Sequence, residues 1–383
     1  MKFQSNKDVL ASAIIFATKL IVGKNSNPLL SGIRIEATSD AVELSSFDHD
    51  VSTKTTIAAE VDAPGVVLVS GKMISDIVSR LPHEQVTLSL VDGKLSIASG
   101  SAKFSLATMP VADYPNLPEL PPTVGTIDGE DFAQAIAQVG VAALRDDGQP
   151  AIGNISVELS ADTISFTATD KYRIASRDIA WKKSGITDPL QVLVPARVLT
   201  EVGKMFHQND EVSISLYTSG EKEIIALSAG DKVVTSSLGK GMFPHVRRLL
   251  DDKGHGESFA IVSASELIDA TRRVSLVIDK DNALRYSFDE NGVQLDAVNG
   301  ENAQGSETVD IHLVGEPVVA WLKPKLFIDG LAGAHSQFVR LGFTASSEPG
   351  KAGPVLFTAH TSRDDASVHT SYRYLMQPNL LPR

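Results

Sequence analysis

The chain has no cysteine, which excludes disulfide bonds, thiolate metal ligands and a cysteine nucleophile. It also lacks an apolar run of about 18 residues, the length that a membrane-spanning helix requires. The N-terminal stretch M-K-F-Q-S-N-K-D has no apolar segment typical of a signal peptide. From these absences we expect a cytoplasmic protein with no membrane partner.

Positive charge is scarce as well. The chain has 35 Lys and Arg against 47 Asp and Glu, a net charge of -12. Taken alone, this balance argues against tight, sequence-independent DNA binding, which depends on a strong basic field. The 383 residues exceed what one hydrophobic core supports and fit two or three domains.

A pattern typical of an amphipathic helix recurs three times along the chain, at residues 7–22, 129–144 and 264–279. The third copy opens with Ser263 and Glu266, which have the spacing of a capping box. In each copy the apolar residues share one predicted helical face: Leu10, Ala13, Ile14, Ala17, Leu20, Ile21; Phe132, Ala135, Ile136, Val139; Leu267, Ala270, Val274, Val277, Ile278.

A second helix is predicted downstream of each first helix, with short alternating strands between them. These helices are predicted at 71–82, 195–207 and 322–334, and the clearest strands at 86–90, 164–169 and 223–228. The period of roughly 125 residues is a domain length, far above that of a solenoid repeat.

Two segments rich in turn residues, 117–125 and 251–258, separate the copies. The sequence therefore predicts an α+β fold of three tandem two-helix, multi-strand domains. We place the domains at 1–121, 122–253 and 254–383.

The six predicted helices differ in charge from the rest of the chain. Counted over residues 7–22, 71–82, 128–145, 195–207, 264–280 and 322–334, they hold 12 Lys and Arg and 10 Asp and Glu, so the rest of the chain carries a net charge of -14. Either the helices are ordinary solvated surface, or they present a weakly positive face to a polyanion. The second interpretation leaves a monomeric DNA-binding module as one alternative.

Catalytic motifs are weak. The cluster Asp48-His49-Asp50 lies in a strand-like stretch, where alternate residues face opposite sides, so we expect a polar strand surface. The loop at 238–244 lacks the spacing of a phosphate-binding loop, and no G-x-S-x-G motif occurs. We expect no enzyme activity, no cofactor and no metal site, with a hydrolase or nuclease using Asp48 and Asp50 as the alternative.

The last ten residues, Y-L-M-Q-P-N-L-L-P-R, are apolar although chain ends are usually polar. Their two prolines forbid a regular helix and discourage a central strand. We expect an extended segment that is either tucked into the core or part of a contact surface.

Four stretches are informative when taken together. The most specific are T-D-K-Y-R-I-A within 166–175 and F-P-H-V-R-R within 234–250. The others are S-A-K-F-S-L-A-T-M-P-V-A-D-Y-P-N-L at 101–117 and the C-terminal ten residues. With them, the whole chain resembles the family of bacterial DNA polymerase III beta subunits, the replicative sliding clamps.

This resemblance implies a head-to-tail homodimer that closes into a ring around double-stranded DNA, with helices inside and sheets outside. Such a ring holds DNA by topology, so its inner face needs only weak positive charge. It implies a nucleoid-associated processivity factor that needs an ATP-driven clamp loader. Its expected partners are the DNA polymerase III alpha subunit, the loader, other polymerases, and mismatch-repair and ligation proteins, bound through short linear motifs.

The resemblance also implies site residues. The expected DNA contacts are Lys24, Lys72 and Gln149, and Met73 and Leu276 are the expected apolar residues of the dimer interface. The expected peptide cleft between the second and third domains comprises Ile152, Thr169, Lys171, Tyr172, Arg173, Ile174, Pro244, Arg248, Leu249, Leu375, Gln377, Pro378, Asn379, Leu380 and Leu381. Within it, Arg173 and Arg248 are expected to orient a peptide at the mouth of an apolar pocket.

Two positions depart from the family pattern. Leu380 stands where an arginine is expected in the tail, and Lys171 stands where several relatives have glycine or another small residue. We expect partner preference to differ at these positions, and at Gln377 and Asn379.

Overall fold

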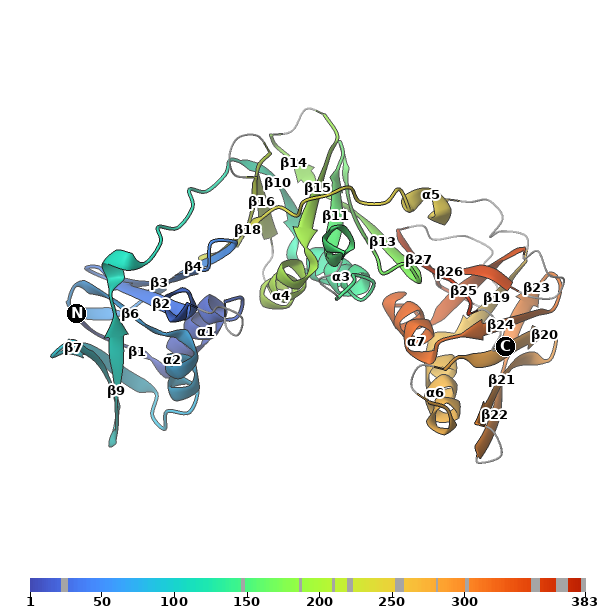
Figure 1. Cartoon of the computed structure of the whole chain (residues 1–383), viewed down its shortest axis with the longest axis horizontal. Helices are drawn as coiled ribbons and strands as arrows, with labels where there is room; N and C mark the ends of the chain where they lie inside the picture. The colour runs from blue at the N-terminus through green and yellow to red at the C-terminus, as the bar shows by residue number, and fades with distance from the viewer. Residues whose placement is uncertain are drawn as a thin grey trace. The chain divides into compact units, whose positions relative to one another are not determined.

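The structure is a computed structural model. It describes residues 1–21, 27–145, 149–185, 188–208, 211–218, 223–251, 258–279, 282–299, 303–345, 352–362 and 371–379. The chain divides into two compact units. Figure 1 shows its helices and strands. Unit 1 comprises Met1–Ala133, Trp181–Asp188 and Arg197–Leu238, and unit 2 comprises Gln134–Ala180, Pro189–Ala196 and Gly239–Arg383.

Unit 1 contains one 14-stranded sheet with the order β14-β10-β16-β17-β18-β4-β3-β2-β6-β9-β8-β7-β1-β5. All of its strand pairs are antiparallel. The strands are β1 (Lys2–Asn6), β2 (Gly32–Ala37), β3 (Ala41–Phe47), β4 (Val51–Ala58), β5 (Glu60–Ala63), β6 (Gly65–Ser70), β7 (Gln85–Val91), β8 (Lys94–Ser99), β9 (Ala102–Met109), β10 (Thr123–Asp128), β14 (Lys182–Lys183), β16 (Glu211–Tyr217), β17 (Ile224–Ala229) and β18 (Lys232–Ser237).

Unit 2 contains a nine-stranded sheet, β15-β11-β12-β13-β27-β26-β25-β19-β23, and a four-stranded sheet, β22-β21-β20-β24. The nine strands are β11 (Asn154–Leu159), β12 (Thr163–Thr169), β13 (Arg173–Ala180), β15 (Leu190–Pro195), β19 (Ser258–Ser263), β23 (Ile311–Val314), β25 (Phe338–Ala345), β26 (Ala352–His360) and β27 (Tyr372–Met376). The other four are β20 (Leu284–Asp289), β21 (Gly292–Asn299), β22 (Ala303–Val309) and β24 (Val318–Leu322).

The predicted repeat of two helices per copy is present. The pairs are α1 (Lys7–Thr18) and α2 (Gly71–Val78), α3 (Gly129–Gly140) and α4 (Ala196–Phe206), and α6 (Ala264–Val274) and α7 (Pro324–Gly333). A short helix, α5 (Arg247–Leu250), was not predicted, and 3-10 turns lie at Pro28–Ser31, Val111–Asp113, Pro150–Gly153 and Ser275–Val277.

The helices bury the apolar faces that their spacing predicts. Leu10, Ile14 and Ala17 of α1 are fully buried in a core of unit 1, against Ile33, Leu44 and Val69 of the sheet among others. On α3, Phe132 and Ile136 are buried in the same way. Helix α1 begins where the Asn6 side chain accepts hydrogen bonds from the N–H groups of Asp8 and Val9.

Two local predictions were wrong. Ser263 precedes α6, but its side chain makes no capping hydrogen bond to the helix, so the predicted capping box is absent; its Oγ lies 3.5 Å from that of Ser265. The C-terminal segment was not expected to form a central strand, yet Tyr372–Met376 pairs with β13 on one side and β26 on the other. Its first proline, Pro378, lies just beyond the strand, where it removes no ladder hydrogen bond.

Candidate functional site

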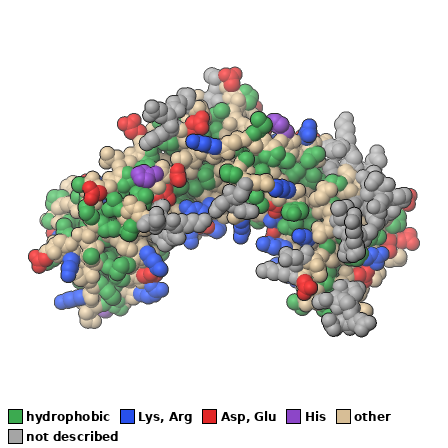
Figure 2. Space-filling model, viewed as in Figure 1, with side chains coloured by type: hydrophobic (Ala, Val, Ile, Leu, Met, Phe, Trp, Pro, Cys, Tyr) green, Lys and Arg blue, Asp and Glu red, His purple; other side chains and the backbone are tan. Residues whose placement is uncertain are grey.

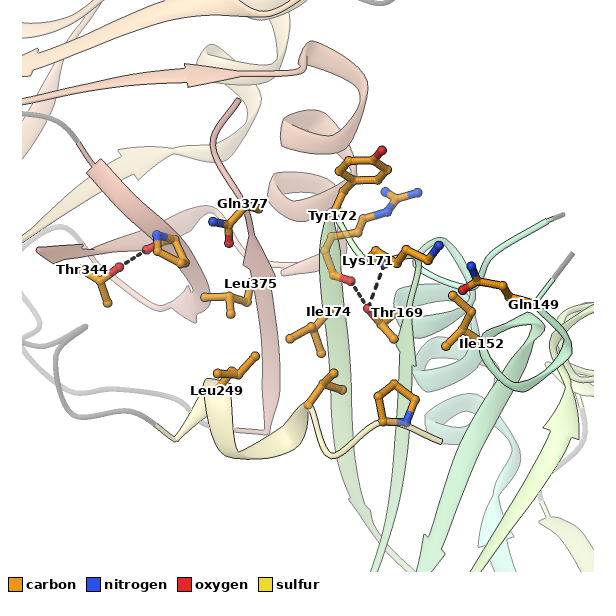
Figure 3. Close-up of a pocket in the computed structure, with 14 residues that line it drawn as sticks. Gln149, Ile152, Thr169, Lys171, Tyr172, Ile174, Leu249, Thr344, Leu375 and Gln377 are labelled. Atoms are coloured by element: carbon orange, nitrogen blue, oxygen red, sulfur yellow. Dashed lines mark hydrogen bonds between the residues drawn. The ribbon is translucent and has the colours of Figure 1, made fainter. Parts of the chain in front are cut away.

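A hollow of about 640 Å³ opens in unit 2 beside the β13–β27 pair (Figure 3). We call it the cleft. It is lined by Gln149, Ile152, Thr169, Lys171, Tyr172, Arg173, Ile174, Pro244, Val246, Leu249, Thr344, Pro354, Leu375 and Gln377.

Most residues predicted for a peptide cleft meet here, although they come from distant parts of the sequence. Ten of them line it: Ile152, Thr169, Lys171, Tyr172, Arg173, Ile174, Pro244, Leu249, Leu375 and Gln377. Gln149, which was predicted to contact DNA, lines it too. The structure thus brings together residues from three of the four stretches that carry the resemblance: 166–175, 234–250 and the C-terminal ten residues.

The remaining predicted residues lie elsewhere. Arg248 is exposed and lines a neighbouring hollow of about 260 Å³ rather than the cleft. Pro378 and Asn379 follow the last lining residue, and the Asn379 N–H donates to the carbonyl oxygen of Trp321 at 2.8 Å. Leu380 and Leu381 lie outside the described residues.

Three lining residues were missed by the sequence prediction: Val246, Thr344 and Pro354. Val246 lies inside the F-P-H-V-R-R motif, so its spacing could have been noticed. Thr344 and Pro354 lie on β25 and β26, where the Thr344 hydroxyl donates to the Pro354 carbonyl at 2.8 Å. Their position depends on strand pairing over long distances in sequence, which no local pattern reveals.

The cleft floor is apolar because two small hydrophobic groups meet there. One contains Ile174, Leu250, Leu356 and Leu375, and the other contains Ile152, Leu193 and Phe243. Val246 packs against both groups. A leucine or phenylalanine side chain entering the cleft would therefore leave water for an apolar surface that is already formed.

The turn between β12 and β13 holds the rim in place. The Thr169 hydroxyl donates to the Arg173 carbonyl at 2.7 Å and accepts from the Lys171 N–H at 3.2 Å. The Asp170 carboxylate accepts from the N–H groups of Tyr172 and Arg173, each at 3.1 Å. Lys171 has φ of 80°, in the left-handed region that non-glycine residues rarely adopt.

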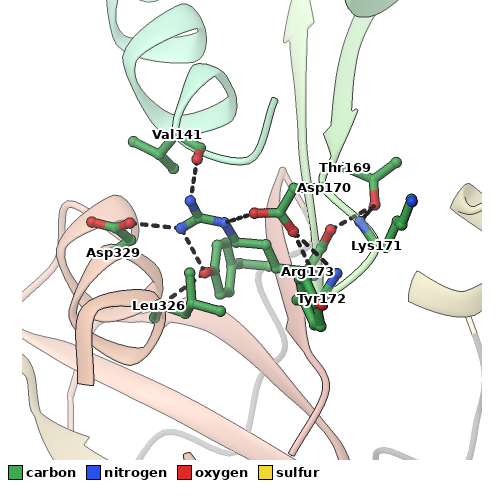
Figure 4. Close-up of polar contacts among 9 residues, drawn as sticks. Val141, Thr169, Asp170, Lys171, Tyr172, Arg173, Leu326 and Asp329 are labelled. Atoms are coloured by element: carbon green, nitrogen blue, oxygen red, sulfur yellow. Dashed lines mark hydrogen bonds and ion pairs between the residues drawn. The ribbon is translucent and has the colours of Figure 1, made fainter. Parts of the chain in front are cut away.

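Arg173 forms a buried ionic network behind this turn (Figure 4). Its guanidinium is bonded to Asp170 at 2.9 Å, to Asp329 of α7 at 2.6 Å, to the Tyr374 hydroxyl at 3.2 Å and to the Val141 carbonyl. Burial alone would lower the pKa of Arg173, but Tyr374, Asp329 and Asp170 outweigh it and raise that pKa. The side chain is only 7% exposed.

This geometry corrects the expected role of Arg173. Its guanidinium is committed to Asp170 of its own turn and to groups of α7, β27 and the segment after α3, and does not stand free at the mouth of the cleft. Arg173 positions the β12–β13 turn against α7 and β27, and thereby holds the rim that carries Lys171 and Tyr172.

A second ionic group supports α5, which carries Leu249 into the cleft wall. Arg247 donates to both oxygens of Asp178 at 2.8 Å. Arg373 of β27 bonds to Asp178 at 3.1 Å and to Asp251. These bonds fix α5 to β13 and β27 from outside the cleft.

The other predicted site residues are on helices or outside the described residues. Lys72 and Met73 are exposed on α2, and Leu276, in the turn after α6, is 83% exposed. Lys24 lies outside the described residues. In Figure 2, Lys and Arg side chains show beside α2 and α4 in unit 1 and beside α7 in unit 2.

Asp48-His49-Asp50 is a turn between β3 and β4, not the strand surface that we expected. The Asp48 carboxylate accepts from the N–H groups of Asp50 at 3.1 Å and Val51 at 2.7 Å, and His49 has φ of 79°. A carboxylate used in this way is typical of an Asx turn. Among the described residues, no group of three or more His, Asp or Glu side chains could hold a metal ion.

The described part of the chain has no helix long and apolar enough to span a bilayer.

Comparison with known proteins gives a consistent result. Residues 1–118, 126–245 and 254–355 match the N-terminal, central and C-terminal domains of the DNA polymerase III beta subunit. The chain is 40% identical to the beta sliding clamp of Micrococcus luteus over 313 residues, which cover 82% of this chain and 100% of the relative. It is 33% identical to that of Streptomyces coelicolor over 379 residues, 99% of each chain.

A solved structure has the same fold. The DnaN sliding clamp from Pseudomonas aeruginosa bound to griselimycin superimposes with a TM-score of 0.87 at 22% identity, covering 100% of both chains. The chain belongs to the DNA polymerase III beta subunit family. The resemblance drawn from the sequence is thereby confirmed, together with the three tandem clamp domains and the function of a DNA sliding clamp.

Proposed function

We propose that two copies of this chain close head to tail into a ring around duplex DNA. The observation that carries the proposal is a pair of free sheet edges. Within the described structure, residues 102–107 of β9 pair only with β8, and β22 pairs only with β21. Free edges present rows of N–H and C=O groups to another strand. Strand β9 of one copy and β22 of the other can therefore continue a sheet across the interface.

Exposed apolar side chains on β9, on α2 and in the turn after α6 support the same interface. Phe104 of β9 is 42% exposed, Met73 of α2 is 54% exposed and Leu276 follows α6. Phe104 was not predicted as an interface residue. Burial of three such side chains would stabilise each interface by several kcal/mol, at roughly 1.5–3 kcal/mol per side chain.

The helical charges support sliding rather than tight DNA binding. Several helix cations are matched by acids: Arg80 with Asp76, Lys204 with Glu201, and Arg272 with Asp269. Lys72 is exposed, and no described acid pairs with it. Weak phosphate contacts from Lys72, together with Lys24 and Gln149, would guide the duplex without holding it in one register.

The cleft is the proposed dock for short linear motifs of the DNA polymerase III alpha subunit, the clamp loader, other polymerases, and repair and ligation proteins. Its apolar floor suits Leu or Phe side chains, which contribute roughly 1.5–3 kcal/mol each when buried. Two such anchors give about micromolar affinity after the cost of ordering the peptide, which lets partners exchange. The griselimycin complex of the Pseudomonas aeruginosa clamp supports a ligand site in this fold.

In this proposal the chain has no catalytic activity and no cofactor of its own, and an ATP-driven loader opens the ring. It works in the cytoplasm, on the nucleoid. The domains are proposed at 1–121, 122–253 and 254–383.

Retention on DNA tests the ring. We expect a particle of about twice the 40.8 kDa chain mass by sedimentation, which after loading stays on nicked circular DNA and runs off once the circle is linearised. Leu276→Asp should give monomers and abolish retention, because a carboxylate would be placed in an apolar interface. Met242→Asp is the matched control, since Met242 is equally exposed, at 83%.

Equal loss from linear and circular DNA would favour a monomeric DNA-binding module instead. DNA turnover that disappears in Asp48→Asn would favour the hydrolase alternative. Deletion of residues 380–383 should weaken peptide binding and leave the dimer intact; loss of folding would place the tail in the core.

A further inference from the structure

The side chains that line the cleft include cations but no acids, although the net charge of the protein is -12. No Asp or Glu is among the lining residues, while Lys171 and Arg173 are. The nearest carboxylates are committed elsewhere: Asp170 and Asp329 are paired with Arg173. The charge of Arg173 is thereby neutralised, and Lys171 is the lining cation that no described carboxylate pairs with.

Lys171 is the cation of the cleft that is available to a ligand. Its side chain is exposed, and among the described residues no acid pairs with it. Arg173 is buried with its own partners, as described above. Figure 3 shows Lys171 and Gln149 at the end of the cleft that carries Ile152.

The direction of Lys171 is set by the backbone. Its N–H is held by the Thr169 hydroxyl, and the N–H groups of the next two residues are held by Asp170. The φ of 80° is one that glycine adopts without strain and lysine does not. Glycine would serve the turn better, so the turn itself does not explain the lysine.

Other cations lie along the same rim. The Lys323 ammonium lies 5.5 Å from the ring centroid of Tyr172, which is 59% exposed, in a cation–π contact. Arg248 is exposed beside the neighbouring hollow. Lys323 and Arg248 thus add two further cations near the cleft.

We propose that Lys171 forms a carboxylate subsite of the cleft, so that the preferred partner segment is an apolar motif carrying one Asp or Glu that pairs with Lys171. This inference rests on the proposed peptide-docking function and names the chemistry of the partner. Gln149 would accept or donate a hydrogen bond at the same end, and the leucine or phenylalanine anchors would occupy the floor between Ile152 and Leu375.

Matched peptides test the subsite. The probes are fluorescein-labelled hexapeptides with two Leu or Phe anchors, in which each remaining position in turn is Asp or its neutral isostere Asn. For at least one position, the Asp peptide should bind the wild-type dimer about fivefold more tightly than the Asn peptide, as expected for a partly exposed ion pair. The Asp-to-Asn ratio, which is the affinity of the Asp peptide divided by that of the Asn peptide, should fall below about two in 1 M salt, where the Debye length is about 3 Å.

Substitutions of Lys171 separate the effect of its charge from the effect of its strained backbone. In Lys171→Gln, which keeps a Cβ at the strained position, the Asp-to-Asn ratio should fall to about one, while Lys171→Arg should restore it. Lys325→Gln removes an exposed lysine of α7 that does not line the cleft, and should leave the ratio unchanged. Thermal melting of each variant confirms folding.

A ratio that persists in Lys171→Gln, or that stays near one in the wild type at every position, would overturn the carboxylate subsite while the apolar cleft remains. Failure of all peptides to bind would overturn the docking function itself, and the subsite with it.

Discussion

Two antiparallel strand pairs join successive repeats, and they differ in what lies beside them. In unit 1, β4 pairs with β18; in unit 2, β13 pairs with β27. The groove beside the first pair, about 520 Å³, is lined by the charged residues Arg34, Glu43 and Lys54 on the sheet and by apolar residues of the linker such as Val111, Leu117 and Leu120. The cleft beside the second pair is lined mainly by apolar side chains. The first groove thus has one wall of ion-paired side chains beside apolar linker residues, whereas the second has an apolar floor.

The linkers explain part of the difference. The linker after β9 is anchored by Tyr114, whose buried hydroxyl accepts from the Phe47 N–H at 2.7 Å and donates to the Gly32 carbonyl at 3.2 Å. The linker after β18 is anchored through Arg247, which is bonded to Asp178 outside the cleft. Tyr114 therefore takes up part of the space beneath the first linker and lines the remaining groove, whereas Arg247 holds the second linker from outside the cleft.

The largest expected effect concerns the charge buried at the second junction. Arg173→Met should lower the free energy of unfolding by about 3 kcal/mol, because Asp170 and Asp329 lose their shared partner in a site of low exposure. The first junction supplies the control: Arg34→Met removes a partly exposed arginine paired with Glu36 and should cost less than about 1 kcal/mol. Urea unfolding at matched protein concentration measures both.

Equal losses in these two variants would contradict the contrast between the junctions. Arg173→Met should also weaken peptide binding, since the rim turn is no longer held against α7. Arg34→Met should not.

The role of Arg173 shows where sequence reasoning stops. The T-D-K-Y-R-I-A motif indicated that Arg173 belongs to the cleft, and the structure places it there. Its partners Asp329 and Tyr374 lie 156 and 201 residues away, however, so no local spacing predicts the network. The motif therefore located the residue but misassigned what its guanidinium does.

The fold, too, was predictable only in part: the helices could be predicted, and the strand partners could not. Helix periodicity identified both helices of every repeat, because each buries one apolar face. It could not reveal that β18 pairs with β4, or that the C-terminal strand is central, because strand partners are chosen by tertiary packing. The free edges of β9 and β22 were hidden for the same reason.

The second-largest expected effect is a loss of folding stability at alkaline pH, caused by Tyr114 at the first junction. Burial, opposed by the hydrogen bond from Phe47 and reinforced by Asp48, raises the pKa of Tyr114 from 10.0 to about 12. Because the folded-state pKa is the higher one, the stabilisation is complete below pH 10 and is lost as pH rises towards 12. The difference in unfolding free energy between wild type and Tyr114→Phe should fall by about 2 kcal/mol over that range.

Urea titrations of both proteins at pH 8, 10 and 11.5 measure this difference. A difference that stays constant across the series would show that the Tyr114 hydroxyl ionises as readily in the folded chain as in the unfolded one.

A matched pair of tyrosines compares the junctions directly. Tyr374 donates to the Leu326 carbonyl at 2.8 Å and accepts from Arg173, while Tyr114 bonds two backbone groups. Each Tyr→Phe change should cost about 1–2 kcal/mol at neutral pH, since buried partners lose a hydrogen bond. Only Tyr374→Phe should change peptide affinity, by about threefold or more, because only Tyr374 supports the arginine behind the cleft rim.

Fluorescence anisotropy with one labelled peptide distinguishes the two variants. A comparable loss of affinity in Tyr114→Phe would mean that the junctions are coupled, and that the cleft depends on unit 1 as well.

The smallest expected effect belongs to the ion pairs of the first junction. Glu43 lies 2.5 Å from Lys54 and 4.0 Å from Arg34, and all three side chains are at least one quarter exposed. Solvent screens such pairs, so Glu43→Gln should change the unfolding free energy by less than about 0.5 kcal/mol, and still less in high salt. A loss of unfolding free energy as large as that of Arg173→Met would show that the ion pairs beside β4 and β18 are shielded from water as fully as the network beside β13 and β27. The two junctions would then differ in their lining residues alone and not in how their charges are held.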